Sequence, residues 1–432
     1  MSRLSALPPT LAALALLASG APAWGASSTA AATASATRTA SSAAAIAPTA
    51  RTASSAAASA PTARTARTTA APHTARAAGR ASTTAKRVRA ASALPTPADP
   101  EFASQWELAD DAAMGVRTAW RASTGGNVVV AIVDTGADLT HHDLVPNLWT
   151  NEREIPGNGI DDDNDGYVDD VHGADIVDGD GTPQDLNGHG THVAGVVGAR
   201  GGNALGVTGV AWNVKLMIVR ALGADGRGDL DDLATGIRYA VRNGARIVNL
   251  SVAGAEDDPG LEAAIDEARA AGVLVVAAAG NTGTDLDATP AYPAASPAPN
   301  LIAVGSTDRA GALAAGSSFG RAAVDVTAPG EDIESTAFDG GYELRSGTSQ
   351  AAAQVTGTLA LMAAARPAAS WDALRSALLA GATPRPSSLL PVAAGALNAG
   401  GALRALGVTP KKATARTAKS RAKARAARSA KR

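Results

Sequence analysis

Residues 127–136 read NVVVAIVDTG, an apolar run that passes directly into a polar turn. Short runs rich in Val and Ile, without polar alternation, are typical of strands that are buried on both faces of a parallel sheet. Four later runs have the same character, at residues 215–222, 246–251, 273–279 and 301–306. We therefore expect a set of buried parallel strands, the first of which ends at Asp134.

Between these runs lie segments whose apolar residues recur every three or four positions, the spacing of an amphipathic helix. Several begin with Asp or Ser, which commonly cap helix N-termini. The predicted helices span residues 229–243, 258–271, 349–365 and 370–379. This alternation predicts an α/β fold, a doubly wound, mostly parallel β-sheet flanked by helices. In such sheets functional residues gather beyond the carboxyl ends of the strands.

The charges of the 432-residue chain are divided between its middle and its ends. All 40 Asp and Glu lie between Asp99 and Asp372, and residues 95–410 contain 18 Lys and Arg, which gives this segment a net charge of −22. The two ends carry 20 Lys and Arg and no acidic residue. Because the chain has no cysteine, disulfides, thiolate metal sites and a thiol nucleophile are excluded.

Residues 1–25 have the features of a secretory signal peptide. Arg3 precedes a short apolar run at residues 11–17, and small residues at 21–25 offer a cleavage site. The alternative is an N-terminal buried helix. A membrane span takes about 20 apolar residues, so we expect no span and a secreted protein, either extracellular or held in the periplasm or envelope.

Two further segments are strongly biased in composition. Residues 26–98 are rich in Ala, Ser, Thr and Arg, and we expect a low-complexity linker or pro-segment there. Residues 409–432 predict a basic disordered tail. Three roles are open for the basic segments: contact with the acidic domain, contact with an external polyanion such as an envelope polymer or nucleic acid, or removal by proteolysis.

Three polar motifs lie at the ends or starts of the expected elements. They contain Asp134, the pair His189 and His192, and Ser349. Taken singly, the aspartate is a turn or cap residue, the histidines are a metal pair or a cap, and the serine is an N-cap. Taken together, they supply a nucleophile, a base and an orienting carboxylate, the groups that a serine needs to attack a carbonyl.

Asn281 adds a fourth group after the run at 273–279, because its amide can donate a hydrogen bond to a developing oxyanion. The chain order Asp134, His189, Ser349, with Asn281 before the serine, resembles that of the subtilisin family of serine proteases. The resemblance implies a catalytic triad of the first three residues and an oxyanion hole formed with Asn281.

The resemblance covers residues 99 to about 406, and we place the peptidase domain at 99–408. Supporting stretches are DPEF at 99–102, GVTGVA at 206–211, NLSVAG at 249–254, a cis-proline turn at Tyr292-Pro293, a core turn at 328–330 and GALNA at 395–399. It implies a subtilisin-like fold and a serine endopeptidase that acts on protein or peptide substrates. We expect a monomer.

The resemblance also implies a substrate site. Its residues would be Ser251, Val252, Ala253 and Gly254, opposite a wall of Ala278, Ala279 and Gly280. The substrate would lie as an added strand, held by main-chain hydrogen bonds. Ala253 stands where the family usually has glycine, so we expect a preference for small or medium apolar residues before the scissile bond.

The chain departs from the family directly after its nucleophile. Residues 350–354 read QAAAQ, where the family usually has an apolar residue followed by Ala-Ser-Pro-His or Ala-Ala-Pro-His. The rival interpretation is a catalytically idle relative that serves as a calcium-dependent binding or envelope protein, although no triad member is missing. A nucleic-acid-binding protein that uses its basic tails would not explain the triad.

Six carboxylates crowd into residues 161–170, and their mutual repulsion disfavours a compact loop without a cation. The acids alternate up to Gly166, as in a calcium loop, but His172 stands where a twelve-residue loop has its closing glutamate. We expect structural Ca²⁺ here rather than a solvated acidic loop. The predicted ligands are Asp161, Asp163, Asp165, the carbonyl of Tyr167, and Asp169 or Asp170.

A second calcium site is implied by resemblance alone. In thermitase-like members of the family, the positions of Asp99, Asp143 and Asn203 would share an ion. Such a site would tie the N-terminal arm of the domain to its body.

Overall fold

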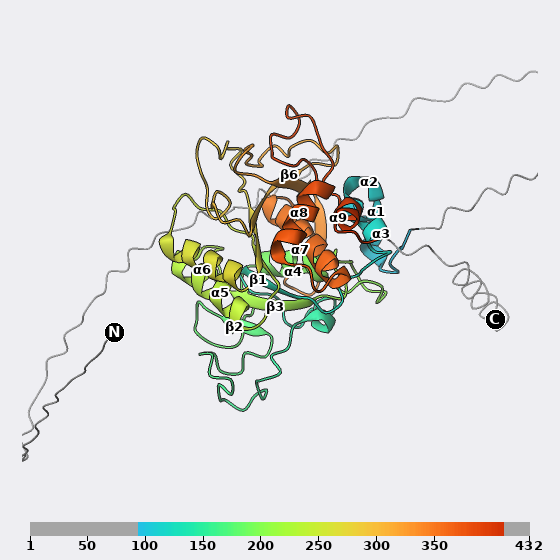
Figure 1. Ribbon diagram of the computed structural model, residues 1–432. Coiled ribbons are helices and arrows are strands. Elements are labelled where there is room, and N and C mark those ends of the chain that lie inside the picture. Colours follow the sequence, from blue (N-terminus) through green and yellow to red (C-terminus); the bar gives the residue numbers. More distant parts are fainter. Residues whose placement is uncertain (1–93, 410–432) are drawn as a thin grey trace, which may run out of the picture. The chain divides into compact units, whose positions relative to one another are not determined.

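The computed structural model describes residues 94–409 of the chain (Figure 1). The predicted signal peptide, nearly all of the predicted linker or pro-segment, and the tail from residue 410 lie outside the described residues. The predicted peptidase domain at 99–408 falls within them. In this part of the chain no helix combines the length and the apolar character that crossing a bilayer requires.

Seven parallel strands form the central sheet, in the order β2-β3-β1-β4-β5-β6-β7. Most of their residues are buried, as expected for strands that are covered on both faces. The predicted α/β fold with a doubly wound, mostly parallel sheet is confirmed. The strands are β1 (Val129–Asp134), β2 (Gly173–Asp175), β3 (Lys215–Arg220), β4 (Ile247–Leu250), β5 (Leu274–Ala278), β6 (Leu301–Thr307) and β7 (Val326–Pro329).

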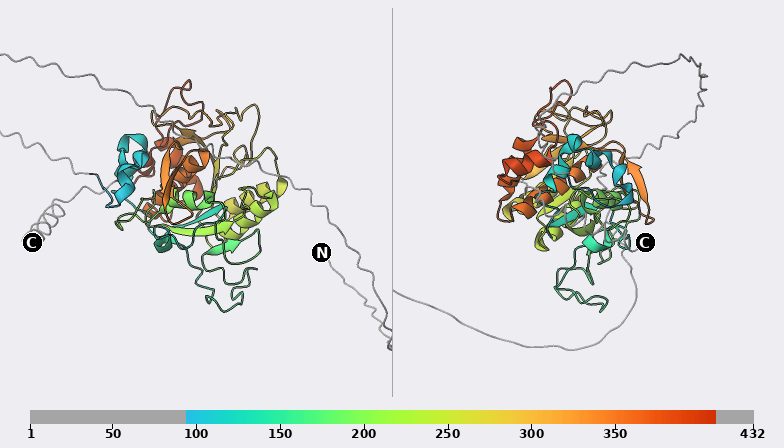
Figure 2. Two further views of the ribbon diagram at one scale, coloured as in Figure 1. Left: turned by 180° about the vertical axis from the view of Figure 1, so that it is seen from behind. Right: turned by 90° about the vertical axis from the view of Figure 1, so that its right-hand side faces the viewer.

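Helices cover both faces of the sheet (Figures 1 and 2). In β1, Val130 and Ile132 pack into a core shared with α4 and α7, whereas Ala131 and Val133 pack into a second core shared with α5 and α6. The helices are α1 (Trp106–Ala109), α2 (Asp111–Met114), α3 (Val116–Ala119), α4 (His189–Gly198), α5 (Leu230–Arg242), α6 (Pro259–Ala270), α7 (Thr348–Ala365), α8 (Trp371–Gly381) and α9 (Ala399–Ala405).

Some elements were not predicted from the sequence. Strand β2 has only three residues, and β7 was assigned in part to a turn at 328–330. An antiparallel hairpin of β8 (Ile333–Thr336) and β9 (Tyr342–Arg345) was also missed, because its strands read IEST and YELR and contain no apolar run. The peptide bond between Tyr292 and Pro293 is cis, as the resemblance implied.

The predicted helix caps are confirmed only in part. Asp258 caps α6, since its side chain accepts a hydrogen bond of 2.8 Å from the backbone amide three residues later. Asp229 and Ser370 stand at the N-caps of α5 and α8 but make no side-chain cap hydrogen bond. Ser349 lies inside α7, whose N-cap is Gly347, so the interpretation of Ser349 as an N-cap is wrong.

Two aspartates at N-cap positions, of which only Asp258 makes a cap hydrogen bond, allow a matched test of the α6 cap. We expect Asp258→Ala to lower the free energy of unfolding by about 1 kcal/mol, because the amide loses its acceptor. Asp229→Ala, which removes the same charge at a helix start without removing a cap bond, should cost clearly less. Thermal melts of both variants beside the parent check this, and equal losses would contradict it.

Candidate active site

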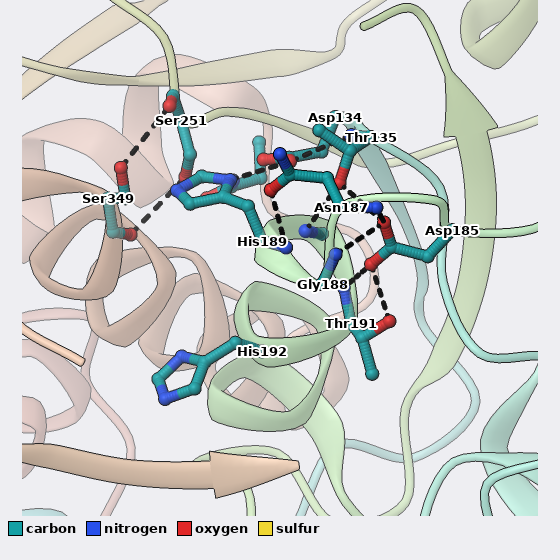
Figure 3. A network of polar contacts seen from close by, with 12 residues as sticks. Asp134, Thr135, Asp185, Asn187, Gly188, His189, Thr191, His192, Ser251 and Ser349 are labelled. Carbon is teal, nitrogen blue, oxygen red and sulfur yellow. Dashed lines mark hydrogen bonds and ion pairs between the residues drawn. The ribbon is translucent and has the colours of Figure 1, made fainter. Parts of the chain in front are cut away.

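Three polar side chains meet at the carboxyl edge of the sheet (Figure 3). Asp134 is the last residue of β1, His189 is the first residue of α4, and Ser349 is the second residue of α7. The imidazole of His189 lies between the other two residues. The fold thus brings together three residues that are far apart in the sequence, as the sequence analysis expected.

Asp134 holds His189 in one tautomer. Nδ1 of His189 donates to Oδ1 of Asp134 at 2.7 Å, and the amide of Thr135 donates to the same oxygen at 2.8 Å. Burial disfavours the charged imidazole, but the charge and hydrogen bond of Asp134 outweigh burial and raise the pKa of His189 above its ordinary 6.5. With its proton on Nδ1, the neutral ring keeps Nε2 free to accept another.

A second buried carboxylate, Asp185, fixes the start of α4. Its Oδ1 accepts the hydroxyl of Thr135 at 2.9 Å and two backbone amides just before His189 at 2.8 Å each. Its Oδ2 accepts the amide and the hydroxyl of Thr191 at 2.9 and 2.6 Å. Asp185 was not predicted as a functional residue, although an aspartate close before a helix start is a recognisable capping signal.

The hydroxyl of Ser349 donates to the carbonyl of Ser251 at 3.3 Å, and the Ser251 hydroxyl donates to the carbonyl of Ser349 at 3.3 Å. Within residues 94–409 no hydrogen bond joins this hydroxyl to His189, although the ring lies beside it (Figure 3). Rotation about one side-chain bond redirects a serine hydroxyl. Catalytic hydrogen bonds commonly tighten only when substrate binds.

Asn281 presents an unused donor beside the serine. Its Oδ1 accepts the amide and the hydroxyl of Thr348 at 2.9 and 3.1 Å, which fixes the orientation of the side-chain amide. Its Nδ2 is buried and has no partner among the described residues. A methyl group on Gly347 would lie 3.1 Å from this nitrogen. A buried donor without an acceptor is unfavourable, so an oxyanion formed at Ser349 would satisfy it.

His192 has a different environment from His189. Its Nε2 donates to the carbonyls of Ile333 and Glu343 at 3.1 and 3.2 Å, and the amide of Gln350 lies 3.4 Å from its Nδ1. Burial lowers the pKa of His192 to about 3, so this ring stays neutral. No possible metal cluster within residues 94–409 contains either histidine, so the structure does not support a histidine metal pair.

The predicted substrate residues lie beyond the ends of β4 and β5. Residues 251–254 continue β4, and Gly254 exchanges two hydrogen bonds of 2.8 Å with the backbone of Tyr292. Residues 278–280 close β5, and a methyl group on Gly280 would lie 3.2 Å from Cβ of Ala253. The two segments are therefore neighbours, and the methyl group of Ala253 narrows the space between them.

Two groups of carboxylates in the loop between β1 and β2 could hold a cation. Within each group the ligand oxygens lie within 4.8 Å of one another. Clusters of carboxylate oxygens are the donors that Ca²⁺ prefers, so the donor set fits this ion. The groups are Glu154 with Asp161 and Asp163, and Asp163 with Asp165 and Asp170.

Glu154 was not predicted as a ligand. It is buried, and its Oε1 accepts the amides of Asp162 and Asp163 at 2.8 and 3.2 Å. Glu154 lies before the acidic run. The calcium-loop pattern instead has its glutamate after the run, at the position of His172, and therefore did not point to Glu154. The only sequence signal for it is one of two glutamates, Glu152 and Glu154, that stand shortly before the acidic run.

The structure distinguishes the two alternative ligands at the end of the loop. Asp170 is buried within one carboxylate group, and burial raises its pKa to about 6. Asp169 instead accepts hydrogen bonds from three backbone amides of residues 157–159 at 2.7 to 3.2 Å, and it belongs to neither group.

The backbone of Tyr167, whose carbonyl was predicted as a ligand, lies next to the carboxylates. Its amide donates to Asp165 at 3.2 Å.

The residues of the second predicted calcium site also come together, through hydrogen bonds. Nδ2 of Asn203 donates to Asp143 at 2.6 Å, and the hydroxyl of Tyr342 donates to the other oxygen of Asp143 at 2.8 Å. Asp99 accepts amides of residues 202 and 204 at 2.7 and 3.1 Å. Among residues 94–409 the possible metal clusters do not include these three residues.

Comparison with known proteins identifies the class. The subtilase family matches residues 125–409. The chain belongs to this family. This confirms the resemblance seen in the sequence and the prediction of a subtilisin-like serine protease.

Individual relatives agree with this assignment. A thermophilic serine proteinase of Bacillus sp. (strain AK1) is 41% identical over 57% of this chain and 54% of its own length, so the chain spans about half of that relative. Thermitase of Thermoactinomyces vulgaris is 37% identical over 64% of this chain and 88% of its own. A solved protease structure from Pseudoalteromonas arctica is 30% identical, with a TM-score of 0.61, over 72% of this chain and all of its own.

The environment of His189 predicts the pH profile. The ring must be neutral to accept a proton, so activity should fall as the pH drops through the pKa of His189. Because Asp134 raises that pKa, we expect the acid-side midpoint of kcat/KM above 6.5. Hydrolysis of an uncharged peptide from pH 4 to 9 gives this midpoint. A midpoint near 4 to 5, the range of a carboxyl group, would contradict the assignment.

Proposed function

We propose that the protein is a secreted, calcium-stabilised serine endopeptidase. The observation that carries this proposal is an oriented imidazole, 2.7 Å from Asp134 and beside Ser349, together with a buried, unused amide donor on Asn281, whose Oδ1 is bound to Thr348, the residue before Ser349. A buried donor without an acceptor lowers the stability of the resting protein. Such a donor is expected where the acceptor, here the oxyanion, forms only during the reaction. Secretion is part of this proposal because of the predicted signal peptide, and a monomeric state is part of it as an expectation from the sequence.

In the proposed reaction Ser349 attacks the peptide carbonyl while Nε2 of His189 takes the hydroxyl proton. Asp134 stabilises the resulting imidazolium. Asn281 and the backbone N–H of Ser349 donate to the oxyanion of the tetrahedral intermediate. His189 then returns the proton to the leaving amine, and water hydrolyses the acyl-enzyme by the same steps.

Protein or peptide substrates would bind as a strand added along residues 251–253. Gly254 already pairs with Tyr292, so its backbone groups are occupied and this end of the strand is fixed. Main-chain recognition permits many sequences. The methyl group of Ala253 beside Gly280 supports a preference for small or medium apolar residues before the scissile bond.

The rival interpretation is a catalytically idle relative. This interpretation rests on the unusual QAAAQ sequence after Ser349. The side chain of Gln350, however, contacts His192 rather than a triad member. An idle relative would bind peptide without cleaving it. Hydrolysis of unfolded casein, with and without a serine-directed phosphonylating inhibitor, separates the two interpretations.

The first test of the mechanism is substitution of the nucleophile. Ser349→Ala should lower turnover by about 10⁴- to 10⁶-fold, because the triad residues act as a unit. Asn281→Ala should cost about 10²- to 10³-fold, since one oxyanion donor remains. Ser370→Ala, the same substitution at the start of α8, should keep full activity on casein. Parent-like activity of Ser349→Ala would refute the proposal.

Calcium would act as a structural ion in this proposal. Glu154, Asp161, Asp163, Asp165 and Asp170 would hold it and offset their mutual repulsion. An ion bound only by the folded state raises stability with the logarithm of its concentration. The chain has no disulfide that could replace this constraint on the loop.

Chelation should therefore lower the thermal midpoint of the parent protein. Asp163→Asn with Asp165→Asn should abolish most of this response. Asp162→Asn with Asp169→Asn is the matched control, because it removes the same charge from the same loop but from residues outside both carboxylate groups. Melts in calcium and in excess chelator check this. The calcium site is refuted by an unchanged midpoint in chelator, or by equal losses in the two double variants.

A further inference from the structure

The β8–β9 hairpin brings a basic side chain next to the catalytic histidine. Arg345 is the last residue of β9 and stands four positions before Ser349. A methyl group on Gly188, the residue before His189, would lie 3.0 Å from Nη2 of Arg345 and 3.4 Å from Cβ of Phe338. The guanidinium therefore packs against the residue that carries His189 into the site.

The electrostatics of the site agree with this placement. The carboxylates of Asp134 and Asp185 raise the pKa of His189, and the positive charge of Arg345 opposes them. Arg345 also helps to lower the pKa of the buried His192. The positive charge of Arg345 therefore acts on the imidazole of His189, the group that would protonate the leaving amine.

The order of the strands shows which half of a substrate faces Arg345. The acyl half would lie over β4 and β5, where Ser251 and Asn281 are found, and β1 lies on the other side of β4. His189 is bound to the end of β1 through Asp134, and it delivers its proton to the leaving amine. The residue after the scissile bond therefore extends past His189, toward Gly188 and the hairpin.

The guanidinium of Arg345 has N–H donors that no side chain of the described residues uses. Its Nε donates to Glu343 at 2.8 Å, which fixes the side chain along the hairpin. In the described part of the chain, no side chain accepts a hydrogen bond from either terminal nitrogen, and 23% of the side chain is exposed. Guanidinium groups bind carboxylates through two parallel hydrogen bonds, a geometry that an ammonium group does not match.

We propose that Arg345 is a specificity-determining residue that favours Asp or Glu directly after the scissile bond. The inference rests on the proposed function and deepens it, since it names the substrate class. Glu343 neutralises part of the charge but occupies only the Nε edge of the guanidinium. Phe338, 44% exposed, also lies close to Gly188, so the unused terminal nitrogens of Arg345 stand next to an apolar side chain.

The test uses peptides that differ only in the residue after the scissile bond: Glu, Gln, Asp, Asn, Leu or Lys. The parent should cleave the Glu peptide about three- to tenfold faster in kcat/KM than the Gln peptide, the range expected for a partly exposed charge-assisted pair. Arg345→Gln should bring this ratio close to one, and Arg345→Lys should give an intermediate ratio. Arg269→Gln, which removes an exposed arginine of α6, should keep the parent ratio.

A second readout separates specificity from damage to the fold. Loss of the Arg345 charge should raise the pKa of His189, so the acid-side midpoint of kcat/KM on the Gln peptide should move to higher pH in Arg345→Gln. A Glu to Gln ratio of one in the parent, or an unchanged ratio in Arg345→Gln, would overturn the inference while the protease remains established. If the parent cleaves none of the six peptides, the proposed function itself fails.

Discussion

The contact between Asp134 and His189 is the constraint on which the rest of the site depends. A fully buried carboxylate without a partner would be strongly unfavourable, and this one is placed by the end of β1 and bound to the ring and to the Thr135 amide. Asp185 fixes the chain that carries His189. The histidine is therefore oriented before any substrate arrives, so little reorganisation is needed during reaction.

The distribution of charge also matters outside the contact between Asp134 and His189. The domain is strongly acidic, and six of its acids crowd into residues 161–170. Carboxylates held within 4.8 Å repel one another. Arg153 pairs with Asp163 at 2.8 Å, and the proposed calcium ion would offset the remaining charge. Next to His189, Arg345 would give the proposed leaving-group side of the site a positive charge.

The sequence predicted the elements that have a continuous apolar run or a recognisable motif. Buried parallel strands such as residues 127–133 carry a continuous apolar signal, and the four groups around Ser349 sit at strand ends or helix starts, where the fold class places function. Polar elements gave a weaker signal: the β8–β9 hairpin has mixed composition, and the contacts of Glu154 with the acidic loop and of Asp185 with Thr135 join residues that the sequence alone does not bring together. Such residues are recognised once three-dimensional contacts are known.

The central claim is that Ser349 is a nucleophile activated by His189. Peptide mass mapping after brief treatment with a serine-directed phosphonylating reagent tests it most directly. The account predicts one label per chain, on Ser349, with labelling at least about 10³-fold slower in His189→Ala. A label scattered over other serines, or equal rates in the parent and His189→Ala, would contradict it.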